Sequence, residues 1–460
     1  MGKLTNGNLI MLIVYALICV GIGLWSSRRQ KEEDYLIAGR KMSLYGFMAS
    51  VVASYIGGAA IVAYSAFVYQ FGLAAIMVFV GTGVGFLIFI PYALKLRKIS
   101  YEKKFYTLSD WFYYKYNKKV GLISAIILFV VYFGMLLNQF IAGSSILHSI
   151  SGWSYETALI FSSVIITIYL MAGGFRSVIK TDMFQYIVLL VLFVLVGYLV
   201  MNDGADRAVE MVERSKMNVT DALSFIFFGV FIIFQSAEYW QRVYAAKSAK
   251  VVRRGFIGSS ILVLITGLAL SFIGMAARTS TAGLEPEQAI AYGLSEMLPQ
   301  GMLGFGLVLI FAAIMSSADT IIFVLASSIA EDYFGHLSKK QKTPERLMRQ
   351  TRLFVLIFGI TGFALAWIFR DIIEVLKFIT GLGFTIIPGI IASFHWNISS
   401  RSMVISFLSG IVYIVAVILL GFLKIEAAVA SLLVSGLALF IAHQISRKKH
   451  SKLENESDKK

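Results

Sequence analysis

The sequence predicts an all-α polytopic membrane protein with about thirteen transmembrane helices. Of its 460 residues, 58% are hydrophobic and only 15% are charged, whereas a soluble domain usually has about a quarter charged residues. Apolar stretches close to the length that a bilayer demands follow one another from residue 8 to residue 446. Basic residues gather in alternate connections between these stretches, which is the positive-inside pattern of membrane proteins.

The apolar stretches are too long for barrel strands, which need only about ten alternating residues each. Each stretch is therefore expected to be a helix. In chain order the predicted spans are approximately 8–27, 42–69, 71–97, 120–150, 155–173, 180–201, 219–245, 254–277, 300–333, 351–370, 371–395, 402–422 and 426–446.

The distribution of charge predicts the orientation in the bilayer. The connections that we place on the cytoplasmic side are basic. The connections on the opposite side are short or nearly uncharged, apart from segment 202–218, which carries charges of both signs. This places the N-terminus outside and the C-terminal tail in the cytoplasm of a plasma or inner cell membrane. The loop bias also accounts for the net charge of +15 without a nucleic-acid partner. The basic residues of the inner connections are Arg28, Arg29, Arg40, Lys41, Lys95, Arg97, Lys98, Lys103, Lys104, Lys118, Lys119, Arg176, Lys180, Lys247, Lys250, Arg253, Arg254, Lys339, Lys340, Lys342, Arg346, Arg349 and Arg352.

The spans divide into two groups of five that are expected to be inverted repeats. An odd number of crossings separates corresponding members, so the two groups have opposite orientations, as in many secondary transporters. The predicted segments are an extra N-terminal helix with its connection (1–41), the first repeat (42–201), an extracellular loop (202–218), the second repeat (219–395), two C-terminal helices (396–446) and a cytoplasmic tail (447–460).

The opening helix of each repeat carries a candidate break. Gly57 and Gly58 lie at the middle of the first of these helices, and Gln235 and Ser236 interrupt the apolar run of the second. Transporters of this plan bind their solutes where such helices unwind. Close helix packing is the alternative explanation for a pair of glycines.

A sodium site is predicted between the first break and span 300–333. Ala313, Ser316 and Ser317 share one helical face there. Two hydroxyls and a carbonyl are hard, neutral oxygen ligands of the kind that suits a small cation. Carbonyls of Ala53 and Ile56, freed by unwinding, would complete the shell. Alternatively, these serines bond back to the preceding helical turn.

Carboxylates inside spans are functional candidates because burying them in a bilayer is costly. Asp319 lies inside span 300–333. Asp182 and Glu238 are two further candidates. Each has a basic neighbour, Lys180 and Arg242 respectively, so structural ion pairs are the alternative and the favoured reading of Glu238. The amide of Gln139 either reaches a solute or bonds a neighbouring helix.

The sequence contains no Walker A motif, so nothing in it couples transport to ATP hydrolysis. No pairing of a nucleophile with a base stands out, and the single cysteine, Cys19, excludes disulfides and thiolate metal clusters within the chain. An enzyme is therefore not expected. An ion gradient is expected to drive transport, unless the protein is a facilitator.

Four segments together resemble the sodium:solute symporter family, which includes sodium/proline and sodium/pantothenate symporters. They are residues 34–40 (DYLIAGR), 173–185 with GGFR, Thr181, Asp182 and Gln185, 241–248 (QRVYAAKS), and 312–332 with AAIMSSAD, ASS and ED. The resemblance covers nearly the whole chain. It implies the leucine-transporter-type bundle of five plus five inverted helices, and sodium as the coupling ion.

The resemblance also implies ligands for the sodium ion at Ala53, Ile56, Ala313, Ser316 and Ser317. Some members add an aspartate where this chain has Tyr55, and members with a second sodium use a hydroxyl where it has Ala313. One sodium per solute is therefore expected. Asp182 is expected on the ion's exit path or in a structural role; a proton or second-ion site there is the alternative.

The solute is expected to be a small organic molecule of the amino acid, vitamin, carboxylate or sugar class. Its predicted contacts are Gly57, Gln139, Gln235 and Ser236. Where proline symporters present a tryptophan, a tyrosine and a proline, this chain has Gly229, Ile233 and Ala237, which argues against proline. Two alternatives are a proton-coupled symporter and a solute-sensing receptor with a transporter fold.

Overall fold

The computed structural model describes residues 6–28, 30–202, 217–280, 283–298, 303–336, 343–369 and 372–457. In these ranges the chain is helical, with one isolated β-bridge between Met42 and Ala246. The predicted all-α class is confirmed. Arg29, Lys339, Lys340, Lys342 and most of the predicted loop 202–218 lie outside the described residues.

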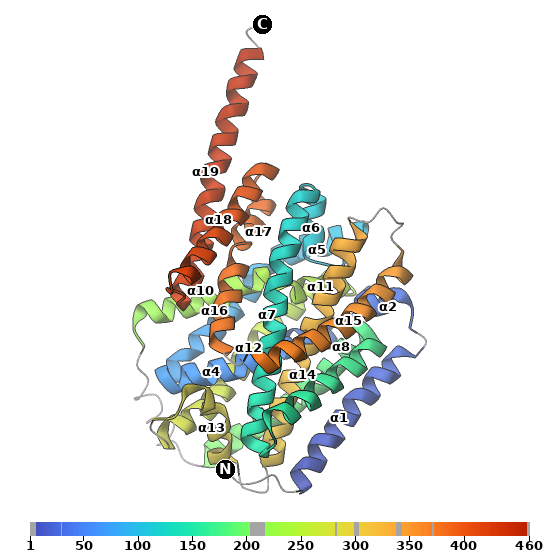
Figure 1. The fold of residues 1–460 in the computed structure, drawn as a ribbon, viewed down its shortest axis with the longest axis vertical. Helices are drawn as coiled ribbons and strands as arrows, with labels where there is room; N and C mark the ends of the chain where they lie inside the picture. Colours follow the sequence, from blue (N-terminus) through green and yellow to red (C-terminus); the bar gives the residue numbers. More distant parts are fainter. Residues whose placement is uncertain are drawn as a thin grey trace.

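The helices pack side by side around a shared core (Figure 1). In chain order they are α1 (Asn6–Ser27), α2 (Glu32–Ile37), α3 (Leu44–Tyr55), α4 (Gly58–Phe71), α5 (Met77–Lys103), α6 (Ser109–Lys115), α7 (Lys118–Ser151), α8 (Tyr155–Asn202), α10 (Val219–Gln235), α11 (Ala237–Ala245), α12 (Ala249–Ser280), α13 (Ala289–Met297), α14 (Leu303–Ser328), α15 (Pro344–Ile368), α16 (Ile372–Phe384), α17 (Ile387–His395), α18 (Ser400–Leu419) and α19 (Ile425–Ser457).

By length and composition, the described residues contain nine helices able to cross a membrane, or up to eleven if each of two bent pairs counts as one span. One of the nine, Ala60–Lys103, holds 44 residues. A straight helix of that length would be about twice as long as a bilayer core is thick. The chain instead turns at Gly72, whose φ of 72° and ψ of −155° end α4 before α5 begins. Predicted spans 42–69 and 71–97 are therefore separate crossings.

The same reasoning applies to α8, where two predicted spans run together as 48 residues. Gly174 inside α8 has a φ of 55°, which a residue with a side chain rarely adopts. A Cβ at this position would lie 2.5 Å from the ring of Tyr35. The two arms of α8 are inclined by 86°. These arms are Tyr155–Ile168 and Leu170–Val191, which together count as one span candidate. The described residues thus give nine to eleven candidates, and about thirteen crossings stays a prediction.

Helix α14 is the centre of the bundle. Of its most apolar window, 94% is buried inside the protein, compared with 33% for α1 and 28% for α19. A helix surrounded by other helices can hold polar groups that lipid would not tolerate. The predicted sodium-site residues of α14 therefore lie in the protein interior rather than against lipid.

The first and last helices lie towards opposite ends of the molecule (Figure 1). Helix α19 also continues to Ser457, well beyond the predicted end of the last span at residue 446. The predicted tail therefore begins as an extension of the final helix that projects from the bundle.

Candidate sodium and solute site

The first broken helix is present where the glycine pair predicts it. Helix α3 ends at Tyr55, and Ile56 has a φ of −91° and a ψ of 66°. Gly57 is extended, and α4 begins at Gly58. Since the last carbonyls of a helix lack partners within it, the break frees backbone oxygens in the middle of the protein.

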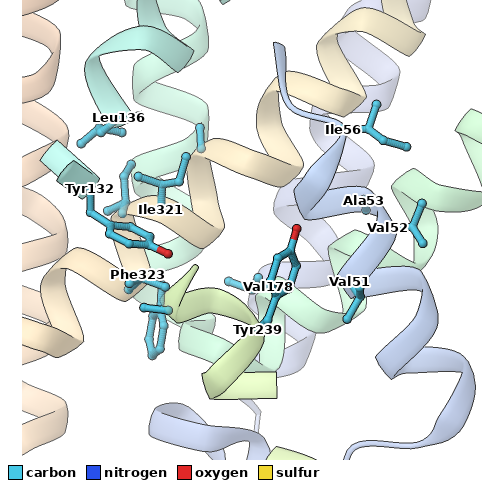
Figure 2. Close-up of a cluster of buried hydrophobic side chains, with 14 of the residues drawn as sticks. Val51, Val52, Ala53, Ile56, Tyr132, Leu136, Val178, Tyr239, Ile321 and Phe323 are labelled. Atoms are coloured by element: carbon cyan, nitrogen blue, oxygen red, sulfur yellow. The ribbon is translucent and has the colours of Figure 1, made fainter. Parts of the chain in front are cut away.

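The adjacent serines of α14 face this break. The hydroxyl of Ser317 donates to the carbonyl of Ser54 at 3.0 Å. A Cβ on Gly57 would lie 2.5 Å from Oγ of Ser317, so only glycine permits this approach. Ala53, Ile56 and Ala313 are buried, and Figure 2 shows Ala53 on α3 and Ile56 just beyond its end. The structure thus brings the predicted sodium ligands of two helices together.

The second hydroxyl, that of Ser316, donates to a carboxylate. Its Oγ lies 2.7 Å from Oδ1 of Asp182 on α8, and Ser50 of α3 donates to Oδ2 at 2.5 Å. A hydroxyl has one proton to donate and two lone pairs. Because Ser316 and Ser317 both give their protons to oxygen acceptors, their lone pairs are available to a cation.

Arg242 of α11 neutralises Asp182. Its Nη2 lies 3.2 Å from Oδ2 of Asp182, and both side chains are fully buried. The same guanidinium donates to the hydroxyls of Ser50, Ser54 and Thr320. A buried ion pair needs such additional hydrogen bonds to offset desolvation. The arginine therefore joins α3, α8, α11 and α14 beside the predicted sodium ligands.

Two ion pairs expected from sequence spacing are wrong. Arg242 pairs with Asp182 rather than with the Glu238 carboxylate, and only its Nη1 contacts Glu238, at the backbone carbonyl. Lys180 lies 3.6 Å over the ring of Trp25 instead of pairing with Asp182. The short spacing along the sequence favoured Glu238 as the partner of Arg242 and Asp182 as the partner of Lys180. The packing of the helices gives Arg242 and Lys180 other partners instead.

A cavity of about 140 Å³ lies next to the predicted sodium ligands. Gly57, Gln139 and Ser236 line it, as predicted for solute contacts. Gln235 is not among the described residues that line it, because its amide oxygen points at Gly383 of α16. The walls are mostly apolar and aromatic, and they include Tyr55, Tyr64, Phe67, Phe79, Phe228, Ile232, Tyr239, Leu376 and Ile379.

Sequence reasoning missed one polar group of the cavity, Asn138, and the partner of another, Glu238. Asn138 is only 1% exposed, and neither atom of its amide has a hydrogen-bond partner among the described residues. Tyr132 donates its hydroxyl to the carboxylate of Glu238, which also lines the cavity. Asn138 precedes Gln139 in an otherwise apolar span, and that polar pair was the available signal.

The second broken helix lies beside the first. Helices α10 and α11 are inclined by 52° at Ser236, whose ψ of 95° is not helical. The break places Ser236 and Glu238 on the cavity wall opposite Gly57. Both predicted breaks therefore contribute to one cavity.

Comparison with known proteins identifies the kind of molecule that has this site. The family model for the sodium:solute symporter family matches residues 35–402. Sodium/proline symporters of Staphylococcus aureus, for example from strains JH9 and NCTC 8325, are 27% identical over 427 residues, which is 86% of this chain and 83% of the relative.

Two solved structures share the fold. A Na⁺-coupled sialic acid symporter in a substrate-bound outward-open state superposes with a TM-score of 0.82 at 18% identity, covering 95% of this chain and 96% of its own. Mhp1, a nucleobase-cation-symport-1 family transporter, superposes with a TM-score of 0.59 at 14% identity, covering 89% and 95%. Both likenesses show the leucine-transporter-type bundle.

Proposed function

The chain belongs to the sodium:solute symporter family and carries out sodium-coupled transport of a solute, and from this premise we propose where its ions and solute bind. The sodium ion is held by the carbonyls of Ala53, Ile56 and Ala313 and by the hydroxyls of Ser316 and Ser317. The observation that carries this proposal is the contact of Ser317 with the carbonyl of Ser54 at the break of α3.

The neighbouring carboxylate supports the same assignment. Because Ser316 donates to Asp182, its oxygen is oriented and made a better ligand, as partners outside the first coordination shell do at metal sites. Asp182 itself is neutralised by Arg242. We therefore assign Asp182 to positioning Ser316 and to the path by which sodium leaves, rather than to a second sodium site.

The solute occupies the cavity between the two breaks, with Gly57, Gln139 and Ser236 as contacts. Sodium binding ties the break of α3 to α14 and so completes the wall of the solute cavity. The coupling is reciprocal, since each ligand raises the affinity of the other by the same factor. One sodium ion crossing about 100 mV contributes about 2.3 kcal/mol, before its concentration gradient is added.

The two five-helix repeats, 42–201 and 219–395, are proposed to move against each other around this site. The chain is placed in a plasma or inner membrane with its N-terminus outside and its C-terminus in the cytoplasm. The basic inner connections support this orientation. The opposite positions of α1 and α19 are compatible with it.

The test of the sodium site is sodium-dependent stabilisation of the purified protein. The melting temperature is measured while NaCl replaces KCl at constant ionic strength. A ligand that binds only the folded state stabilises it by about 2.7 kcal/mol at a hundred times its Kd. We expect the double variant Ser316→Ala/Ser317→Ala to lose this stabilisation.

A matched control is the pair Ser162 and Ser163 on α8. These serines are also adjacent and buried, but their hydroxyls bond back to carbonyls of their own helix. Ser162→Ala/Ser163→Ala should keep the sodium response. An unchanged response in Ser316→Ala/Ser317→Ala would refute the assignment, as would sodium-gradient-driven uptake by that variant at the normal sodium dependence.

A further inference from the structure

The carboxylate of Glu238 lies in the wall of the solute cavity and forms no ion pair among the described residues, although the charge of Arg242 acts on it through space. Glu238 is 5% exposed and belongs to the first turn of α11. Its carboxylate accepts the hydroxyl of Tyr132, whereas the hydroxyl of the neighbouring Ser236 donates to the carbonyl of Ile232. Figure 2 shows the Tyr132 ring reaching from α7 towards α11. The hydrogen-bond partner of the carboxylate is therefore neutral.

The nearest arginine is committed elsewhere. Arg242 directs its Nε to Ser50 and its Nη2 to Asp182, and it reaches Glu238 only through the backbone carbonyl. A buried carboxylate without a counter-charge is costly, and it is usually neutralised or paired. Glu238 therefore needs a proton or a cation, and the cavity is where a cation can arrive.

From this arrangement we propose that Glu238 is the counter-ion for a positively charged nitrogen of the transported solute. The proposal rests on the proposed location of the solute cavity. It narrows the solute class to molecules that carry an ammonium group on a compact apolar body. The aromatic wall supports this, since faces of rings such as Tyr55 and Tyr239 attract cations.

The remaining features of the cavity fit such a solute. The unpartnered amide of Asn138 offers both a donor and an acceptor at the same cavity. The volume of about 140 Å³ resembles that of an engineered cavity of about 150 Å³ that binds benzene in another protein. The solute is therefore a small amine or amino acid with an apolar side chain, rather than a sugar.

A purely structural role for Glu238 makes different predictions. An acidic residue in the first turn of a helix is stabilised by the helix dipole and by backbone N–H groups, and the backbone N–H of Glu238 donates to the Tyr132 hydroxyl at 3.3 Å. Glutamine keeps the shape and most of these hydrogen bonds but not the charge. Glu238→Gln therefore separates a structural role from recognition of a charged solute.

The first experiment needs no variant. Melting temperatures of the purified protein in NaCl are measured with matched pairs of probes that differ only at the nitrogen: L-proline and tetrahydrofuran-2-carboxylate, L-leucine and 2-hydroxyisocaproate, and phenethylamine and phenylethanol. We expect at least one ammonium member to stabilise the protein and its oxygen counterpart not to do so. Stabilisation only by sugars or by oxygen counterparts, or by no ammonium probe, would overturn the proposal.

The second experiment uses Glu238→Gln with Glu345→Gln as control, because Glu345 lies at the start of α15 away from the cavity. Glu238→Gln should weaken binding of the ammonium probe at least tenfold and bring its affinity close to that of the oxygen counterpart. Its sodium response should persist, which separates this proposal from the sodium-site assignment. Unchanged discrimination between the paired probes in Glu238→Gln would overturn it.

Discussion

Replacing Gly57 by alanine tests the proposed sodium site through backbone packing, without removing any ligand. A Cβ at this position would lie 2.5 Å from Oγ of Ser317, 2.6 Å from Nε2 of Gln139 and 2.7 Å from Cβ of Ser317. Real Cβ contacts are essentially never shorter than 3.0 Å. The break of α3 and helix α14 must therefore separate by about 0.5 Å or more.

The cost can be converted into a change in sodium affinity. Forcing an extra carbon into a packed interior typically costs about 1–3 kcal/mol. The sodium-bound state needs the α3 carbonyls and α14 hydroxyls at the shortest separation, so most of this cost falls on that state. Since about 1.4 kcal/mol is a factor of ten, the sodium concentration for half-maximal stabilisation should rise roughly 5- to 150-fold.

The assay is the sodium titration of melting temperature in the absence of solute. Gly21→Ala is the matched control, because Gly21 lies in α1 and a Cβ there would meet no atom within 4 Å. It should leave the titration unchanged. A Gly57→Ala protein that folds and keeps the wild-type midpoint for sodium would refute the idea that the contact between α3 and α14 forms the ion site.

Three further predictions concern stability. Arg242→Met leaves the Asp182 carboxylate buried and unpaired, which should cost about 3–5 kcal/mol and lower the melting temperature; adding Asp182→Asn should recover much of the loss. Gly81→Ala places a Cβ 2.2 Å from a backbone carbonyl of α10, so unfolding should become easier by about 1–3 kcal/mol. Asp110→Asn weakens two hydrogen bonds from backbone N–H groups before α6 and the 2.6 Å ion pair with His336, which should cost about 1 kcal/mol.

Each of these outcomes has a direct contradiction in the same melting experiment. If Asp182→Asn alone destabilised as much as Arg242→Met and the double variant were worse than either, the two side chains would not act as a pair. Gly81→Ala with an unchanged melting temperature would show that α5 and α10 separate without cost. Unchanged melting of Asp110→Asn would show that the contacts of Asp110 with the backbone before α6 and with His336 do not stabilise the protein.

Local patterns in the sequence predicted the broken helices and the sodium-facing serines. A glycine pair or a polar interruption breaks the helix in which it lies. The break can therefore be predicted from a short window of sequence. The meeting of Ser317 with the break at Gly57 was predicted from the oxygen ligands that a sodium ion needs and from the family resemblance. The positions of the breaks and of the serines depend on backbone conformation and on the order of the helices, and both can be read from a single sequence.

The partners of Arg242 and Glu238 could not be predicted in the same way. Their spacing of four residues on one helix predicts an ion pair, but the carboxylate that pairs with Arg242 is that of Asp182, 60 positions away on α8. The rotation of each helix about its axis decides which polar groups meet. That rotation is set by the packing of apolar faces, which in a membrane helix carries little sequence signal.

The contacts of Arg242 supply a physical route between sodium and solute. Ser54 accepts the Ser317 hydroxyl through its carbonyl, receives Arg242 on its own hydroxyl, and lines the cavity. Thr320 also bonds Arg242 and lines the same cavity. A sodium ion that fixes α3 against α14 therefore fixes two groups of the cavity wall.

A cation on Glu238 would in turn order the first turn of α11, which carries Arg242. Because both ligands would act on one hydrogen-bonded cluster joining four helices, reciprocal coupling needs no larger rearrangement before the bundle moves.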